Sequence, residues 1–339
     1  MLRHARTSSR LALLGAALAG LISPLLLQPA QAAAPVYVAL GDSYSSGTGT
    51  RSYIADGTSC QRSTKAYPSL IAAARGFSLN FRACSGATIP DVTATQLSAL
   101  TTATGYVTIS VGGNDAGFAD VLTTCALPSW ASNCNGAIDG AQAYVNTTLP
   151  GQLATLYSSI RSRAPYAKVV VVGYPRIFNG EDCNALTWFS PTEEARLNQM
   201  ADLINTRTQA AAASAGFSFA NPTGAFVGHA VCDSPEWLNG LSSPISESYH
   251  PNVLGQASGY TPVVSGAVGA ALAVTPAVVA ASDASGADQA AVQSQYAAAD
   301  AAIEPEPVVA PDLTTPEVRR AARRAGVDLD RFVERSQRR

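Results

Sequence analysis

The stretch that decides the fold spans residues 35–47 and reads Pro35-Val36-Tyr37-Val38-Ala39-Leu40-Gly41-Asp42-Ser43-Tyr44-Ser45-Ser46-Gly47. An apolar, partly β-branched run of strand length ends abruptly in Gly-Asp-Ser, which is typical of a buried central strand of a parallel sheet. Ligands of open α/β sheets bind beyond the carboxyl ends of the strands. Ser43 stands at that position, so we expect its hydroxyl to face a substrate. The alternative is a serine that caps the next helix or turn.

Two further predicted strands end in turns of small residues. The alternating stretch 77–81 leads into Cys84-Ser85-Gly86, and the β-prone stretch 106–111 leads into Gly112-Gly113-Asn114-Asp115. A glycine leaves backbone N–H groups accessible to a ligand, and an asparagine amide carries N–H donors. We therefore expect Gly86 and Asn114 to face a developing negative charge beside Ser43. Taken alone, the second turn is more typical of an ordinary turn.

The remaining elements complete an alternation of strands and helices. Strands are predicted at 168–173 and 217–220, and helices at 66–76, at 139–163 with an interruption at Pro150, after the capping box Ser190-Pro191-Thr192-Glu193, and at 253–273. Such alternation is typical of right-handed crossovers and of a parallel sheet covered on both faces. The predicted fold class is therefore α/β.

The N-terminal 34 residues differ in composition from the rest of the chain. Arginines precede an apolar run over 11–27, and Ala30-Gln31-Ala32 follows the run. This order predicts an export signal over 1–34, cleaved between Ala32 and Pro35. A membrane anchor is the alternative, but glycine, serine and proline residues interrupt the run. We therefore expect a secreted, extracellular protein whose folded domain spans 35–273.

The C-terminal residues 274–339 have a composition of their own. Beyond Pro276 the chain is dominated by Ala, Asp, Ser, Gln, Glu and Pro, with too few bulky apolar groups for a second core. This predicts a low-complexity, mostly disordered tail. Near its end, Thr315-Pro316-Glu317 begins a short arginine-rich helix that Gly326 ends, with a solvated or surface-attaching role.

Six cysteines lie in the predicted domain, and they are Cys60, Cys84, Cys125, Cys134, Cys183 and Cys232. An even number in an oxidising compartment favours three disulfides. Spacing favours pairing of neighbours along the chain, because Cys125 and Cys134 enclose a short loop rich in turn formers, although other pairings stay open. A zinc site is the alternative, but no Cys-x-x-Cys pair is present to form one.

The histidines narrow the search for a base. The chain has three, and His4 leaves with the predicted signal, so His229 and His250 are the candidates. His250 lies in the loop that opens the last predicted helix, from which it could reach Ser43 across the top of the sheet. His229 lies near a cysteine, where a structural or surface role is expected.

These residues together provide the parts that acyl transfer from an ester needs. Ser43 is the hydroxyl nucleophile, His250 is the base, and the Ser43 N–H, the Gly86 N–H and the Asn114 side chain are donors for an oxyanion. The Gly-x-Ser-x-Gly elbow is absent, because Ser45 stands where its second glycine belongs. This argues against an ordinary α/β-hydrolase.

Four separated blocks of the sequence resemble a known family. Gly41-Asp42-Ser43, Gly86, Gly112-x-Asn114-Asp115 and His250-Pro251-Asn252 are similar, in this order, to the blocks of the SGNH or GDSL hydrolases. The agreement covers roughly 35–273. The six cysteines and the stretch Gly41–Gly47 are most similar to those of secreted actinobacterial lipases, esterases and phospholipases. The resemblance implies a three-layer α/β/α sandwich of the flavodoxin-like kind. It also implies the bridges Cys60–Cys84, Cys125–Cys134 and Cys183–Cys232.

One position departs from the family pattern. The family usually has aspartate three residues before the histidine, where this chain has Glu247. A glutamate can hold and charge-stabilise an imidazole, although its extra methylene changes the reach. We hypothesise that Glu247 supports His250 through its carboxylate or its main-chain oxygen.

The sequence thus predicts a secreted serine ester hydrolase that cleaves acyl esters of lipids or small alcohols, without a metal or organic cofactor. We expect a monomer that touches lipid surfaces transiently. The formal net charge of −2 gives no reason to expect nucleic-acid binding. The alternatives are a phospholipase A, a carbohydrate acetyl esterase of the same fold, and a cell-surface binding protein without activity.

Overall fold

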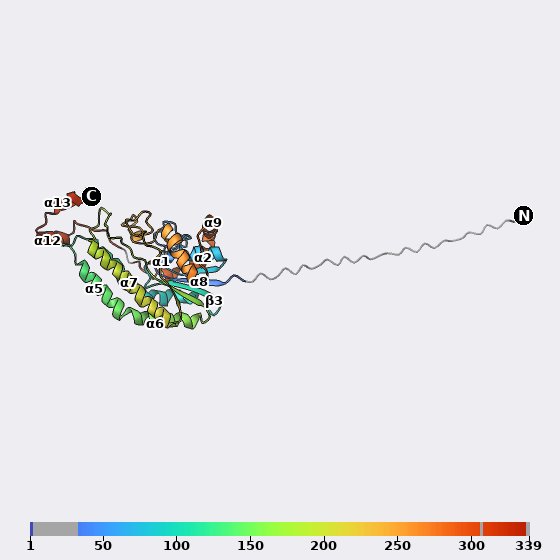
Figure 1. Cartoon of the computed structure of the whole chain (residues 1–339). Coiled ribbons are helices and arrows are strands. Elements are labelled where there is room, and N and C mark those ends of the chain that lie inside the picture. Colours follow the sequence, from blue (N-terminus) through green and yellow to red (C-terminus); the bar gives the residue numbers. More distant parts are fainter. Residues whose placement is uncertain (3–32, 306–307, 337–339) are drawn as a thin grey trace. The chain divides into compact units, whose positions relative to one another are not determined.

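A parallel sheet lies at the centre of the fold (Figure 1). The computed structural model describes residues 1–2, 33–305 and 308–336. In these ranges five strands pair in the order β2-β1-β3-β4-β5, and they are β1 Val36–Gly41, β2 Ser78–Phe81, β3 Thr104–Ser110, β4 Lys168–Val172 and β5 Ser218–Ala220. All four pairings are parallel, so the carboxyl ends of the strands share one edge. The five predicted strands are confirmed.

Thirteen α-helices are present in the described residues. They are α1 Ser43–Ser46, α2 Tyr67–Arg75, α3 Ile89–Asp91, α4 Phe118–Cys125, α5 Cys134–Thr147, α6 Leu149–Arg163, α7 Pro191–Ser214, α8 Thr261–Val268, α9 Pro276–Ala284, α10 Gly286–Ser294, α11 Ala297–Asp300, α12 Pro316–Ala325 and α13 Leu329–Ser336. Short π-helical segments span Val92–Gln96 and Gly255–Tyr260, and 3₁₀ turns span Leu97–Ala99 and Ile245–Glu247. None of these helices has the length and hydropathy that crossing a bilayer requires.

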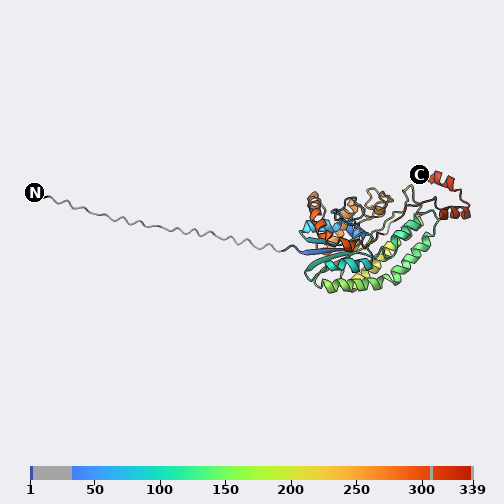
Figure 2. The same cartoon turned by 180° about the vertical axis from the view of Figure 1, so that it is seen from behind.

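Helices cover both faces of the sheet. α6 and α7 pack on one side, and α2 and α8 pack on the other (Figures 1 and 2). The capping box predicted at Ser190 begins α7, with the Glu193 carboxylate accepting from the Ser190 N–H. Pro150 stands in the first turn of α6, which is why the predicted helix 139–163 is two helices. The result is the α/β/α sandwich that the family resemblance implied.

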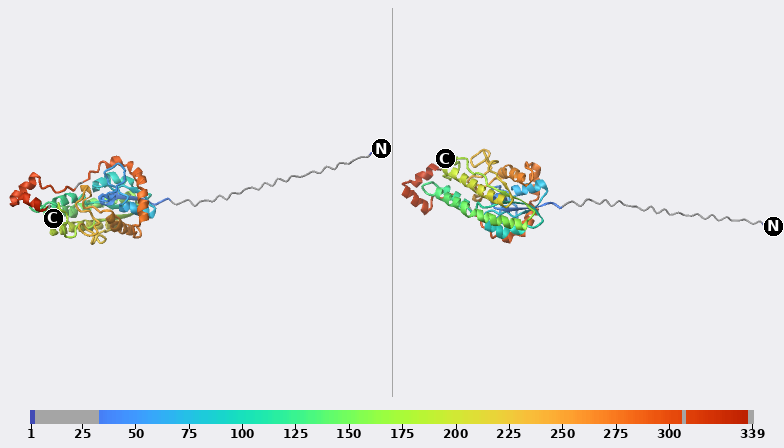
Figure 3. Two further views of the ribbon diagram at one scale, coloured as in Figure 1. Left: turned by 90° about the horizontal axis from the view of Figure 1, so that it is seen from above. Right: turned by 60° about the horizontal axis from the view of Figure 1, so that its bottom comes forward.

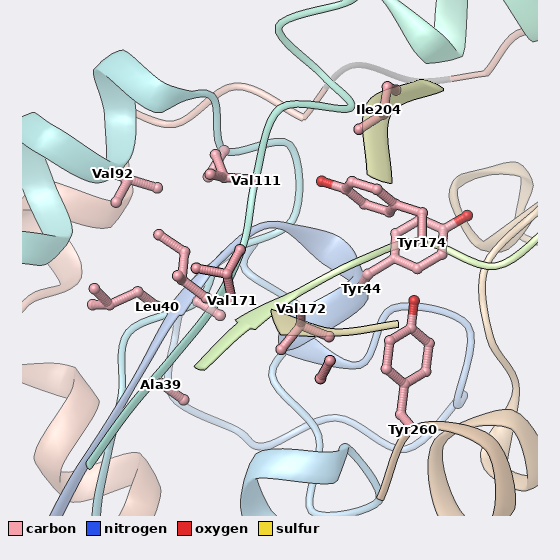
Figure 4. Close-up of a cluster of buried hydrophobic side chains, with 14 of the residues drawn as sticks. Ala39, Leu40, Tyr44, Val92, Val111, Val171, Val172, Tyr174, Ile204 and Tyr260 are labelled. Atoms are coloured by element: carbon pink, nitrogen blue, oxygen red, sulfur yellow. The ribbon is translucent and has the colours of Figure 1, made fainter. Parts of the chain in front are cut away.

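The strands are apolar because both of their faces are buried. Figure 4 shows Leu40 of β1 and Val171 of β4 within one cluster of side chains, and both are fully buried. At the carboxyl ends of the strands the cluster gives way to tyrosine rings, with Tyr44 and Tyr174 in edge-to-face contact at 5.1 Å. Each buried aliphatic side chain stabilises the fold by roughly 1.5–3 kcal/mol. These rings form a layer beneath this edge of the sheet, which we call the tyrosine floor.

Three disulfides brace the loops of the domain. They join Cys60 to Cys84, Cys125 to Cys134, and Cys183 to Cys232, which are the pairs that the family resemblance implied. The first lies beside the Gly86 turn, and the second links the end of α4 to the start of α5. The export signal predicted for 1–34 falls almost wholly on residues outside the described ranges.

The C-terminal segment corrects the prediction of a mostly disordered tail. Residues 276–300 form α9, α10 and α11, and these helices pack on the domain (Figure 3). The arginine-rich helix is present as α12, capped by the Thr315 hydroxyl and ended by Gly326. The prediction was wrong because amino-acid composition shows only whether a segment has enough apolar residues to form a core of its own. This segment instead completes a core that already exists.

Asp300 shows how the tail does so. Its carboxylate lies 2.6 Å from the guanidinium groups of both Arg62 and Arg82, and all three side chains are fully buried. Gln293 on α10 accepts from Arg82 as well, and the ring of Tyr296 lies 3.9 Å from its guanidinium carbon. A buried cation needs a partner because its desolvation is costly. The tail therefore supplies the carboxylate that pairs with Arg82, and it gives Arg62 a second partner beside Asp56, which lies 2.7 Å from the Arg62 guanidinium.

We expect Asp300→Ala to lower the free energy of unfolding by about 3–5 kcal/mol, because it leaves the buried guanidinium group of Arg82 without a carboxylate and that of Arg62 with Asp56 alone. Urea unfolding of the full chain, followed by tryptophan fluorescence at neutral pH, measures this loss. Asp288→Ala is the control, since Asp288 is exposed on α10, and it should cost less than about 0.5 kcal/mol. Equal midpoints for the two variants would contradict the structural role of the tail.

Candidate active site

The position of Ser43 follows from how β1 ends. Gly41 has a φ of +120°, and a Cβ at this residue would lie 2.3 Å from the carbonyl oxygen of Ser110. Only glycine fits there. The buried amide of Gln96 accepts from the Gly41 N–H at 2.7 Å and donates to its carbonyl at 2.9 Å. Strand β1 thus stops at a fixed point, and Asp42 and Ser43 begin α1 directly beyond it.

His250 reaches Ser43 from the far end of the domain. Its Nε2 lies 2.8 Å from the Ser43 Oγ, and its Nδ1 lies 2.9 Å from the carbonyl oxygen of Ser248. A carbonyl can only accept, so Nδ1 carries the hydrogen and Nε2 presents a lone pair to the serine hydroxyl. The Tyr44 hydroxyl donates to the carbonyl of Tyr249 at 2.8 Å, which ties the histidine loop to α1.

The environment keeps this imidazole neutral. Burial lowers the pKa of His250 from 6.5 to about 4, and the hydrogen bond to Ser248 opposes the shift. The ring of Tyr44 packs beside it, with ring centroids 5.2 Å apart. A neutral imidazole with a free lone pair toward a hydroxyl is the state that a general base needs.

Glu247 does not hold the imidazole, contrary to the hypothesis from the sequence. Its carboxylate accepts from the Tyr53 hydroxyl at 2.7 Å and from the Arg51 guanidinium at 3.0 Å. The oxygen that meets the imidazole belongs to the backbone of Ser248, one residue later. Tyr249 adopts a φ of +62°, and the chain turns there between that carbonyl and the histidine. Every residue has a backbone carbonyl, so the residue type at position 248 could not show that this carbonyl accepts from His250.

Gly86 and Asn114 lie at the same site. Both line the cavity that contains Ser43 and His250. One N–H of the Asn114 amide donates to the carbonyl of Ala87 at 3.0 Å, and the amide carries a second N–H. The carboxylate of Asp115 accepts from the Ile89 N–H at 3.0 Å. These bonds hold the turns after β2 and β3 in one arrangement beside the serine.

A buried network beneath the serine was missed by sequence reasoning. Burial raises the pKa of Asp42 to about 6, and hydrogen bonds from Ser110, Tyr174 and Tyr44 oppose the rise. The Tyr174 hydroxyl, which donates to Asp42, also accepts from the Gly113 N–H at 3.2 Å. Asp42 thus links the serine turn to the turn that carries Asn114. Ser110 ends β3 and Tyr174 follows β4. Both are far from Asp42 in the sequence, so the residues around Asp42 could not predict these hydrogen bonds.

His229 has the structural role expected of it. Its ring stacks on that of Trp237 with centroids 3.7 Å apart, and its Nδ1 lies 2.9 Å from the Pro235 carbonyl. Among the described residues, one close group of metal-ligand types occurs, formed by Cys183, Cys232 and Glu236. The two sulfur atoms are bonded to each other, so this group offers no thiolate.

The cavity at Ser43 is small. It has a volume of about 70 Å³, and the apolar side chains of Phe118 and Leu122 on α4 line one side of it. A second cavity of about 30 Å³ shares Ser43, Asn114 and Phe118 and reaches toward α7. The arrangement holds a nucleophile, a base and amide donors around one point, with apolar walls beside them. Such a site suits attack on the carbonyl of an uncharged acyl group.

Known proteins are similar to this chain over most of its length. The model of the GDSL-like Lipase/Acylhydrolase family matches residues 39–257. Lipase 1 of Streptomyces coelicolor is 49% identical over 256 residues, which are 75% of this chain and 93% of that protein. A lipase of Streptomyces rimosus is 46% identical over 267 residues, 78% of this chain and 98% of that protein.

Two solved structures share the fold. The crystal structure of the extracellular lipase of Streptomyces rimosus has a TM-score of 0.66 and 47% identity, and the match covers 69% of this chain and all of that one. Phospholipase A1 of Streptomyces albidoflavus NA297 matches with a TM-score of 0.66 and 45% identity, over 69% of this chain and 99% of that one. The chain belongs to the GDSL-like lipase/acylhydrolase family, and it is a carboxylic ester hydrolase.

Proposed function

We propose that the chain hydrolyses acyl esters through an acyl-enzyme on Ser43, with His250 as the base. The observation that carries the proposal is the 2.8 Å contact between the Ser43 Oγ and the His250 Nε2. The hydroxyl oxygen attacks the ester carbonyl while its proton passes to Nε2. The carbonyl of Ser248 accepts from Nδ1–H, which keeps the ring oriented and stabilises the imidazolium that forms.

The tetrahedral intermediate carries a negative oxygen that needs donors. We assign this role to the Ser43 N–H, the Gly86 N–H and the Asn114 side chain, which line one cavity. Collapse of the intermediate breaks the ester C–O bond, and the imidazolium returns its proton to the leaving alcohol. Water then attacks the acyl-enzyme with His250 again taking the proton, which releases the acid and restores the serine.

The substrates proposed are acyl esters of lipids or small alcohols. The similar proteins named above are lipases, which favours this class. A phospholipase A activity is the second candidate, because one similar structure is a phospholipase A1. Nitrophenyl esters of increasing acyl length, run beside phosphatidylcholine vesicles, separate the two. The chemistry assigned here needs no metal or organic cofactor.

The proposal extends to where the enzyme works. An export signal over 1–34 would deliver a domain beginning at 35 to the extracellular space, where disulfides form and persist. The similar lipase of Streptomyces rimosus is extracellular. We propose that the secreted enzyme acts as a monomer, touches lipid surfaces transiently and has no nucleic-acid partner.

A serine-directed organophosphonate should modify Ser43, because its hydroxyl is the one paired with a neutral imidazole. Peptide mapping by mass spectrometry locates the label. Ser43→Ala and His250→Ala should each lower kcat on nitrophenyl acetate by at least about 10⁴-fold. Ser45→Ala is the control for labelling and should still be labelled at Ser43. A label at another residue would overturn the assignment.

Glu247→Gln and Asn114→Ala should separate two kinds of contribution. The first should keep kcat within about threefold, because the Glu247 carboxylate bonds Tyr53 and Arg51 and not the ring. The second should lower kcat by about 10²–10³-fold, because it removes an oxyanion donor. Steady-state kinetics on nitrophenyl acetate decide both. A loss of about 10⁴-fold in Glu247→Gln would return that carboxylate to the catalytic group.

The pH profile should show the lowered pKa of His250. The base must be neutral to act, so kcat/KM for a short ester should persist below pH 6.5 and fall as the pH drops through about 4. The same shift contributes stability that is complete above pH 6.5 and is lost between 6.5 and about 4. Circular dichroism at each pH therefore separates loss of the base from unfolding. A midpoint near 6.5 would show an ordinary, solvated imidazole.

A further inference from the structure

The chain passes over the catalytic cleft after α11. We call residues 303–305 and 308–313 the C-terminal strap (Figure 3). Two of its residues, Pro305 and Val308, line the same cavity as Ser43, Gly86 and His250. Pro305 and Val308 follow Ser43 by more than 250 positions in the sequence and nevertheless share one small cavity with it.

The strap packs against Gly86. A Cβ at Gly86 would lie 2.4 Å from the Cα of Pro305 and 2.9 Å from the carbonyl oxygen of Glu304. Gly86 has a φ of +83°, and the absence of a side chain lets the strap backbone approach this closely. The backbone of the strap thus forms part of the wall of the cavity that contains Ser43.

The strap is held at both ends. Before it, Asp300 is paired with Arg62 and Arg82, and the side chain of Ile303 is 2% exposed. After the cleft, the Val309 N–H donates to the Thr123 hydroxyl on α4 at 3.0 Å. Farther on, Phe332 of α13 packs edge-to-face on Trp130.

Val308 occupies the apolar side of the cleft. Its side chain is 6% exposed and lines the cavity together with Phe118, Ala119 and Leu122 of α4. The volume left is about 70 Å³, whereas pockets for ligands of drug size are about 300–1,000 Å³. An acyl chain of many methylenes would need the apolar surface that Val308 now covers.

The strap lies outside the part of the chain that the family model matches. That model ends at residue 257, and the Streptomyces rimosus lipase is matched over its whole length by 69% of this chain. The strap is thus not part of the pattern that defines the family.

We propose that the C-terminal strap is an autoinhibitory element that fills the long-acyl part of the cleft. With the strap in place the enzyme accepts short acyl esters, and displacement of the strap opens the groove along α4 to long acyl chains. This inference rests on the proposed function, because it takes Ser43 as the nucleophile whose cleft is covered.

The test uses the full chain with single substitutions. Val308→Asp places a charge at the buried position of the Val308 side chain. Because burying an unpaired charge is costly, the strap should leave the cleft. Val309→Asp is the matched control, since the Val309 side chain is 55% exposed. We expect kcat/KM for nitrophenyl dodecanoate to rise at least about tenfold in Val308→Asp and to change less than about twofold in Val309→Asp. The value for nitrophenyl acetate should stay within about threefold of the parent in Val309→Asp, and the ratio of the dodecanoate value to the acetate value should rise only in Val308→Asp.

The two proposals fail in different ways. If the parent chain shows no Ser43 labelling by phosphonate, the proposed function fails. If labelling is intact and a folded Val308→Asp has the acyl-length preference of the parent, the strap proposal is overturned. Should the charge unfold the protein, Val308→Ala decides, because it only enlarges the cavity and should raise kcat/KM for nitrophenyl hexanoate about threefold or more. An unchanged preference in that variant also overturns the strap proposal.

Discussion

The site depends on the close approach of Gly41 to Ser110. The two backbones are so near that a side chain at residue 41 would overlap the Ser110 carbonyl, and the strand has to end there in a left-handed conformation. That ending directs Asp42 into the tyrosine floor and puts Ser43 at the start of α1. β2 and β3 are parallel to β1 on either side of it, so their carboxyl ends lie at the same edge of the sheet. The turns that carry Gly86 and Asn114 therefore lie beside Ser43.

Burial acts on the two ionisable groups of the site in opposite directions. It raises the pKa of Asp42 to about 6 and lowers that of His250 to about 4, and in both cases it favours the uncharged form. A cleft with apolar walls has a lower effective dielectric constant than water. In such a cleft, amide donors stabilise a new oxyanion more strongly than they would in water. The apolar walls are therefore part of the chemistry as well as of the packing.

Much of this was predictable from the sequence, for identifiable reasons. Strands with two buried faces show as apolar runs, and the scarcity of histidine pointed to His250. The Ser248 carbonyl could not be predicted, because main-chain oxygens exist at every residue and the turn at Tyr249 selects among them. The tail was misjudged because the value of Asp300 depends on Arg62 and Arg82 being buried, and that burial is a property of the folded chain.

The pairing of Asp300 with Arg82 has a consequence for the order of folding. The carboxylate follows its arginine by 218 residues along the chain. A buried cation without a partner is costly, so the Arg82 guanidinium has to stay hydrated until Asp300 reaches it. Dehydration of this part of the core therefore comes late in folding, after α10 has packed on β2.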